Sequence, residues 1–175
     1  VDLASEFRYR NPIFEPDTFA IIVSQSGETA DSLAALREAK ANGIKTLGIV
    51  NVVGSSIARE ADNVMYTWAG PEIAVATTKA YSTQLIAQYL LALKFAKVRG
   101  TIDEGVFTSM IGELKQLPEQ ISLLLSHREN VQKFANRYLA TEHVFFIGRG
   151  IDYAISLEGS LKLKEISYIH SEAYA

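Results

Sequence analysis

The chain has 175 residues, with 17 Lys and Arg against 20 Asp and Glu, which gives a formal net charge of −3. Hydrophobic residues make up 48% and charged residues 21%, the balance of a globular chain that buries a core and not of a disordered one. The acidic charge and the lack of a basic run argue against nucleic acid and anionic membranes as main partners. Because the chain has no cysteine, disulfides, thiolate metal sites and a cysteine nucleophile are excluded.

The three histidines, His127, His143 and His170, form no His-x3-His pair, so we expect no metal site. The chain opens without a basic or apolar leader, and its longest apolar segment, 85–95, is too short to span a membrane. It also stops abruptly, without a polar tail. We therefore expect an excerpt from a larger soluble protein of the cytoplasm.

The first hundred residues alternate short β-rich runs with helical runs, the pattern of a parallel α/β sheet. Because the run 19–23 is continuously apolar, we expect a strand buried on both faces. The run 78–98 is apolar around most of its circumference, so we expect a helix buried between layers. The other predicted elements are helix 29–41, which ends at Asn42-Gly43, strand 46–50, helix 56–61 and strand 64–68.

From Gly100 onward, three helices without intervening strands are predicted, and Pro118 is placed at the start of the second of them. Strand character returns at 144–147, and a helix is predicted from 151 to about 168, so the strand–turn–helix unit of 19–41 recurs. The fold class is therefore α/β, a parallel sheet flanked by helices. The three helices are 105–117, 118–126 and 128–139, and the expected division is a first α/β domain (1–100), a helical connector (101–142) and the beginning of a second α/β domain (143–175).

A hydroxyl-rich turn, 24–29 with the sequence SQSGET, joins the first predicted strand to its helix. In parallel sheets, ligands bind outside the carboxyl ends of strands, where the next helix offers unpaired N–H groups and the positive end of its dipole. Gly27 lets the backbone approach a ligand, and the hydroxyls of Ser24, Ser26 and Thr29 can donate to phosphate oxygens. The turn therefore predicts a reversible phosphate site without Lys or Arg. Helix capping by Ser26 or Thr29 is the alternative.

Two threonines, Thr77 and Thr78, open the long helix 78–98. Thr77 could turn toward the same crevice as the hydroxyl-rich turn. The alternative is that Thr77 or Thr78 is a simple N-cap.

A charged stripe lies on the last predicted helix, where Glu158, Lys162 and Glu165 are spaced i, i+4, i+7 and share one face. Apolar rows flank the stripe, so it is not an ordinary solvated face. A carboxylate with a cationic neighbour in such a crevice can shuttle a proton next to a carbonyl. The alternative is an ion pair of Lys162 with Glu158 or Glu165 near the protein rim.

Three segments resemble a known family: 19–31 (FAIIVSQSGETAD), 69–81 (AGPEIAVATTKAY) and 157–175 (LEGSLKLKEISYIHSEAYA). The first is similar to the phosphosugar-binding turn of sugar isomerase (SIS) domains. The other two resemble more specifically the glutamine–fructose-6-phosphate aminotransferase family, and the resemblance runs nearly end to end. It implies a flavodoxin-like, three-layer first SIS domain that lacks its first strand, and the start of a second.

The resemblance implies roles for individual residues. Glu165 matches the family's base, which moves a proton between C1 and C2 of the sugar, and Lys162 matches the lysine that assists it. Thr77 stands where the family usually has Ser, a change that keeps the hydroxyl. The residues implied to bind the sugar phosphate and its hydroxyls are Ser24, Gln25, Ser26, Thr29, Val75 and Thr77.

The resemblance also implies an activity for the parent protein, the conversion of fructose-6-phosphate and glutamine-derived ammonia to glucosamine-6-phosphate, in the hexosamine pathway to UDP-N-acetylglucosamine. It implies no metal or organic cofactor, a glutaminase domain in the same parent chain, and a homodimer or larger oligomer. The family's Cys-Gly-Thr-Ser turn, ring-opening histidine and Schiff-base lysine lie outside this sequence, so we expect the 175 residues alone to be an incomplete, inactive module. The alternatives are a SIS-type phosphosugar isomerase or deglycase, and a non-catalytic sugar-phosphate sensor.

Overall fold

The computed structural model describes residues 1–74 and 76–175, which divide into two compact units, Val1–Phe107 and Thr108–Ala175. The elements of the first unit are α1 (Ala4–Phe7), β1 (Phe19–Ser24), α2 (Ala30–Ala41), β2 (Lys45–Val50), α3 (Ser56–Glu60), β3 (Asn63–Tyr66) and α4 (Thr78–Val98). The second unit contains most of α5 (Glu104–Ser126), then α6 (Arg128–Ala135), the 3-10 helix η1 (Asn136–Tyr138), β4 (His143–Ile147), α7 (Ile151–Ser167) and β5 (His170–Tyr174).

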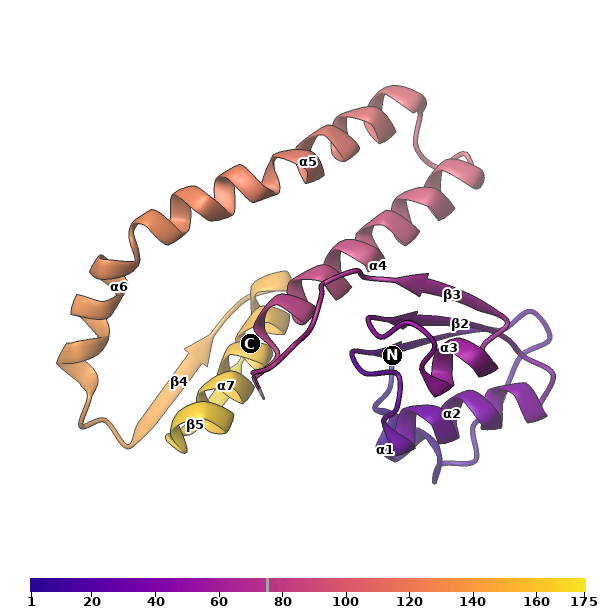
Figure 1. The fold of residues 1–175 in the computed structure, drawn as a ribbon, viewed down its shortest axis with the longest axis horizontal. Helices are drawn as coiled ribbons and strands as arrows, with labels where there is room; N and C mark the ends of the chain where they lie inside the picture. The colour runs from indigo at the N-terminus through magenta and orange to yellow at the C-terminus, as the bar shows by residue number, and fades with distance from the viewer. Residues whose placement is uncertain (75) are drawn as a thin grey trace. The chain divides into compact units, whose positions relative to one another are not determined.

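The first unit is a three-layer α/β/α arrangement around a parallel sheet of order β1-β2-β3. One face of the sheet packs on α2 and α3 through a cluster that contains Leu36 and Ile57, both fully buried. The opposite face packs on α4, where Ala87 contacts Leu47 and Ile49 of β2. Figure 1 shows α4 along one side of this sheet and α2 and α3 along the other. The prediction of a parallel sheet flanked by helices is confirmed.

The expectation that strand 19–23 is buried on both faces is wrong. Phe19, Ile21 and Val23 are each about two-fifths exposed, because β1 is an edge strand and α4 packs on the neighbouring strands instead. The strand with two covered faces is β2, which lies between β1 and β3 and is buried from Thr46 to Val50.

The α4 helix is less buried than its composition predicts. Its buried side chains are the small Ala80 and Ala87, whereas Tyr89, Leu90 and Phe95 are exposed. The helix lies on the sheet along one narrow stripe, so most of its apolar circumference is uncovered within this unit. The expectation of a helix enclosed between two layers is therefore wrong for the described residues.

The C-terminus of α2 ends as predicted at Asn42-Gly43. The Ile44 N–H donates to the Ala39 carbonyl at 3.0 Å and the Gly43 N–H to the Lys40 carbonyl at 2.9 Å, the paired bonds of a Schellman motif. Gly43 has a φ of 76°, which a residue with a Cβ adopts only at a cost. The turn fixes where the chain leaves α2 and enters the central strand.

Pro118 does not begin a helix. It lies inside α5, which runs without a break from Glu104 to Ser126, so the two helices predicted at 105–117 and 118–126 are one. The apolar spacing through Leu114, Ile121 and Leu125 continues across the proline. A proline removes one backbone hydrogen bond, but this pattern persists on both sides of it.

The second unit contains a two-stranded parallel sheet, β4-β5, covered on one face by α7. β5 was not predicted. Ser160 of α7 and Ser171 of β5 are buried and exchange hydrogen bonds, with the Ser171 hydroxyl donating to the Ser160 carbonyl at 2.8 Å. A Cβ on Gly159 would lie 3.1 Å from the Phe146 ring, so glycine permits this close packing. The division into domains at 1–100, 101–142 and 143–175 stays a prediction.

None of the described helices is both long enough and apolar enough to cross a membrane.

Candidate functional site

The hydroxyl-rich turn 24–29 begins where β1 ends, and its hydroxyls are held by the turn itself. The buried Ser24 hydroxyl accepts a hydrogen bond from the Gly27 N–H at 3.1 Å and lies 3.4 Å from the Thr29 hydroxyl. The Ser26 hydroxyl accepts a hydrogen bond from the Glu28 N–H at 3.2 Å. Ser26 only accepts, and one of Ser24 and Thr29 donates to the other, so two of the three hydroxyl hydrogens remain available to donate to an anion.

Gly27 allows the turn to pack closely against the loop that follows β2. Its φ is 67°, and a Cβ at this position would lie 2.1 Å from the Ser55 hydroxyl oxygen. The Gly27 carbonyl accepts a hydrogen bond from the Ile57 N–H, and the Gln25 carbonyl accepts one from the Asn51 N–H, both at 3.0 Å. The turn is therefore held by backbone hydrogen bonds, and any residue with a Cβ at position 27 would collide with the Ser55 side chain.

The two acidic side chains in or next to the turn, Glu28 and Asp31, both have bonding partners. Glu28 accepts a hydrogen bond from the Ser56 N–H at 2.7 Å, and the bonds from Ser56 lower the pKa of the Glu28 carboxyl. Asp31, in the first turn of α2, pairs with Arg8 at 2.9 Å. These contacts hold each carboxylate in place, and Arg8 offsets the charge of Asp31 near the end of α2 where an anion would bind.

The N-terminus of α2 has no side-chain cap. Thr29 occupies the N-cap position, but its side chain makes no capping hydrogen bond, and the Ser26 hydroxyl is bonded to Glu28. The capping alternative is therefore not what the structure shows. The first N–H groups of a helix have no partner within the helix, and together with the helix dipole they favour an anion.

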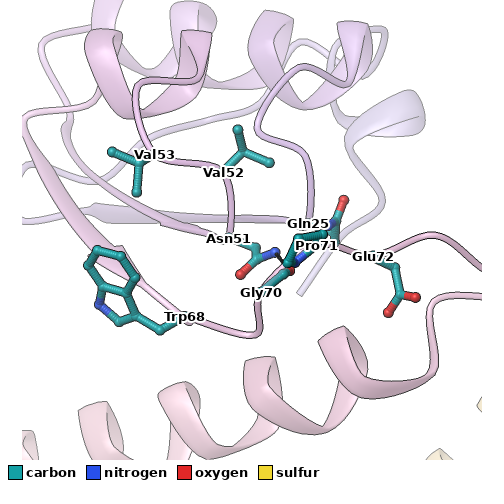
Figure 2. A pocket seen from close by; sticks show the side chains of 8 residues that line it. All are labelled: Gln25, Asn51, Val52, Val53, Trp68, Gly70, Pro71 and Glu72. Atoms are coloured by element: carbon teal, nitrogen blue, oxygen red, sulfur yellow. Dashed lines mark hydrogen bonds between the residues drawn. The ribbon is translucent and has the colours of Figure 1, made fainter.

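A cavity of about 470 Å³ lies next to this turn and is lined by residues that follow all three strands of the sheet. Gln25 follows β1, Asn51 follows β2, and Trp68 lies two residues after β3. In Figure 2 these side chains lie around one opening at the carboxyl edge of the sheet. This is where ligands bind in parallel α/β sheets. The remaining lining residues are Val52, Val53, Gly70, Pro71 and Glu72.

Asn51 and Trp68 were missed by sequence reasoning. Asn51 organises the cavity wall, since its amide donates to the Gly70 carbonyl at 2.8 Å and accepts a hydrogen bond from the Ala69 N–H at 2.8 Å. Trp68 is three-quarters exposed and has a φ of 54°. Position was the available signal for Asn51, which directly follows the predicted strand 46–50. Trp68 was assigned to the predicted strand 64–68, but β3 ends at Tyr66, so Trp68 lies beyond it.

Thr77 occupies the N-cap position of α4 with a φ of 54°, and its side chain makes no capping hydrogen bond. A β-branched residue rarely adopts this left-handed conformation, and such strain often marks a functional position. The simple-cap alternative for Thr77 is thus not seen. Val75, the other residue implied on this segment, lies outside the described residues, as does the side chain of Thr78.

The charged stripe on α7 belongs to the second unit and forms two ion pairs at once. The Lys162 ammonium lies 2.7 Å from a Glu165 carboxylate oxygen and 3.4 Å from one of Glu158. The hydrogen bond to Glu165, aided by the charge of Glu158, raises the pKa of Lys162. The ion-pair alternative is therefore confirmed as geometry. Such a pair is also compatible with proton transfer, because it orients the Glu165 carboxylate on a rigid helix.

Comparison with known protein families identifies the family to which this fold belongs. A family model described as "SIS domain" matches residues 1–94, more than half of the chain. The chain belongs to the SIS domain family. The match includes the hydroxyl-rich turn, the cavity wall and Thr77, so the SIS region holds every candidate site residue of the first unit.

The SIS chain is also similar, over nearly its whole length, to larger enzymes. A glutamine–fructose-6-phosphate aminotransferase (isomerizing) from Caldanaerobacter subterraneus subsp. tengcongensis is 62% identical over 174 residues, 99% of this chain and 29% of the relative. The protein of that name from Methanosarcina mazei is 51% identical over 175 residues, 100% of this chain and 28% of the relative. The chain thus spans less than a third of the length of these relatives.

Solved structures agree with the SIS fold. The C-terminal domain of glucosamine-fructose-6-phosphate aminotransferase from Francisella tularensis matches with a TM-score of 0.96 and 40% identity, over 99% of this chain and 49% of that one. A glucosamine-6-phosphate deaminase from Thermotoga maritima matches with a TM-score of 0.74 and 25% identity, over 98% of this chain and 50% of that one.

Proposed function

We propose that this chain is the sugar-phosphate-binding isomerase part of an enzyme that makes glucosamine-6-phosphate from fructose-6-phosphate and glutamine-derived ammonia. The observation that carries the proposal is the uncapped N-terminus of α2 beside the hydroxyls of Ser24, Ser26 and Thr29, in a turn whose Gln25 lines a cavity of about 470 Å³. The 50–62% identity to glutamine–fructose-6-phosphate aminotransferases supports the choice of substrate.

The phosphate is bound by neutral groups. Ser24, Ser26 and Thr29 donate hydroxyl hydrogens to its oxygens, and the first N–H groups of α2 complete the contact. Gln25, Val75 and Thr77 are the residues that we propose to bind the sugar. Because the turn is fixed against the loop after β2, binding costs little conformational entropy, and the phosphate serves to position the distant C1 carbon.

The proton transfer is carried by α7. Once the sugar ring has opened and ammonia has condensed at C2 with loss of water, the Glu165 carboxylate removes a proton from C1 and an enolamine forms. Return of a proton to C2 gives the aldose amine. Lys162 stays an ammonium through this cycle, since its pKa is raised, and its hydrogen bond keeps the Glu165 carboxylate in one orientation.

The larger protein supplies what this chain does not. We propose a glutaminase domain in the same polypeptide as the source of ammonia, a location in the cytoplasm, and a dimer or larger oligomer. The lengths of the relatives support the first of these, since this chain spans only 29% of the protein from Caldanaerobacter subterraneus subsp. tengcongensis.

Fluorescence of Trp68 tests the choice of ligand, because it is the only tryptophan in the chain and lines the cavity. Fructose-6-phosphate should change the emission in a saturable way, inorganic phosphate should compete, and unphosphorylated fructose should have little effect. Ser26→Ala should weaken binding about tenfold, the loss of one hydrogen bond to a charged group. Ser126→Ala, far along α5, is the matched control. An equal response to fructose and to fructose-6-phosphate would contradict a phosphate site.

A further inference from the structure

Two histidines face each other across the β4-β5 sheet of the second unit. His143 and His170 are partners in the strand register, and their Nδ1 atoms lie 3.2 Å apart. The rings meet edge to face, with centroids 5.2 Å apart and an angle of 77° between their planes. Both side chains are exposed, so solvent reaches the pair.

The separation of the two nitrogens is that of two ligands on one metal ion. With zinc–nitrogen bonds of about 2.0–2.1 Å and tetrahedral angles, two ligating nitrogens lie about 3.3 Å apart. We propose that His143 and His170 form a binding site for a divalent transition metal ion of the zinc type, bound through both Nδ1 atoms. Each ring donates a lone pair to the ion, so both bound rings are neutral at Nδ1.

Glu172 supports the proposed site through the outer nitrogen of the His170 ring. It lies two residues after His170 on the same strand, so both side chains project from the same face, and its carboxylate oxygen lies 3.6 Å from His170 Nε2. A carboxylate at the outer nitrogen of a metal-bound histidine fixes the ring orientation and raises its basicity as a ligand. Glu172 is therefore a positioning residue and not a ligand.

The remaining coordination positions belong to water. Among the described residues, no group of three or more His, Asp or Glu side chains could hold a metal ion, and the His170 side chain is about half exposed. Two imidazoles select for zinc, copper or nickel, whereas magnesium and calcium prefer oxygen ligands. The site is thus open and selective for transition metals.

Calorimetric titration of the full chain with Zn²⁺ tests the proposal, with Mg²⁺ as the control ion. The wild type should bind one equivalent of Zn²⁺ and no Mg²⁺ at the same concentration. His143→Gln and His170→Gln should each lose this equivalent. His127→Gln, a substitution of the third histidine, should retain it. Glu172→Gln should weaken the affinity roughly tenfold, the usual effect of removing such a carboxylate partner.

Circular dichroism of each variant establishes that it is folded, and the two histidine variants are independent, so failure of one to fold leaves the other to decide. Equal Zn²⁺ binding by the wild type, His143→Gln and His170→Gln would overturn the proposal, as would the absence of binding by the folded wild type. In that case the two rings share only a direct Nδ1–Nδ1 hydrogen bond.

Discussion

The hydroxyl-rich turn of the first unit and the charged stripe of the second both follow the pattern of a helix after a parallel strand, yet they are held by different forces. The turn is fixed by backbone hydrogen bonds, and Gly27 leaves room for the Ser55 side chain beside it. The stripe is fixed by the ion pairs of Lys162 with Glu158 and Glu165. One site presents neutral donors on a rigid backbone, and the other presents charges on a helix surface.

The difference suits the two tasks that we propose for these sites, binding of the phosphate and transfer of a proton. Neutral donors at a helix terminus bind an anion without a strong charge of their own, which favours reversible binding. A carboxylate held by an ammonium is oriented to accept a proton, a role in the reaction and not in substrate binding. Substitutions in the turn should therefore change the dissociation constant, whereas substitutions in the stripe should change the rate.

The largest expected effect is that of Glu165→Gln on turnover. In the aminotransferase of which we propose this chain is part, the variant should lower kcat by about 10²- to 10⁴-fold, because the proton acceptor is lost. Its affinity for fructose-6-phosphate should stay within about twofold, given the small energetic effect of an isosteric change away from the phosphate. Glu113→Gln, on α5, is the control. An unchanged kcat in Glu165→Gln would contradict the role of Glu165 as the proton acceptor.

Gly27→Ala should damage the turn through the backbone. The substitution forces a Cβ into a left-handed conformation and against the Ser55 side chain, so we expect a loss of about 3 kcal/mol in unfolding free energy. Gly43 has a similar φ of 76° but nothing within 4 Å of a built Cβ. Gly43→Ala should therefore cost only about 1 kcal/mol. Urea denaturation measures both, and equal losses would mean that the Ser55 contact is unimportant.

Lys162→Met should lower kcat about tenfold, less than loss of the base itself, because Glu165 remains but is no longer oriented. Lys164→Met on the same helix is its control.

The pKa of Lys162 is raised in the folded chain, so its contribution to stability is complete below the ordinary lysine pKa and is lost as the pH rises through the folded value. The stability difference between wild type and variant should shrink at alkaline pH. A difference independent of pH would contradict this.

Glu28→Gln should have the smallest effect, confined to acid. The bonds from Ser56 lower the pKa of Glu28, so its contribution to stability is present at neutral pH and is lost as the pH falls through the folded value. The wild type should be slightly more stable than the variant at pH 7, and the two should converge in acid. Urea midpoints measured over an acidic pH series test this, and curves that stay parallel would show that Glu28 makes no useful contact.

Local sequence patterns predicted where helices and strands lie better than they predicted how buried those elements are. The helix stop at Gly43 was predictable because left-handed conformation is a property of that residue and its neighbours. The exposure of Ile21 was not, since it depends on β1 lying at the sheet edge. Pro118 was misplaced because position inside a helix depends on the apolar pattern on both sides.

The candidate sites show the same division. The turn 24–29 was found because its residues are contiguous, and the stripe because one helix fixes its spacing. Asn51 and Trp68 join Gln25 only through strand order. His143 and His170 are 27 residues apart and meet through the parallel pairing of β4 with the unpredicted β5, so their spacing in the sequence did not indicate that the two rings lie together.

Titration of the folded chain with fructose-6-phosphate by calorimetry, comparing Ser26→Ala with Glu165→Gln, tests the division between binding and chemistry most directly. Our account predicts saturable binding that competes with inorganic phosphate, is weakened about tenfold in Ser26→Ala and is retained in Glu165→Gln. Binding that survives Ser26→Ala unchanged, or that disappears in Glu165→Gln, would contradict it.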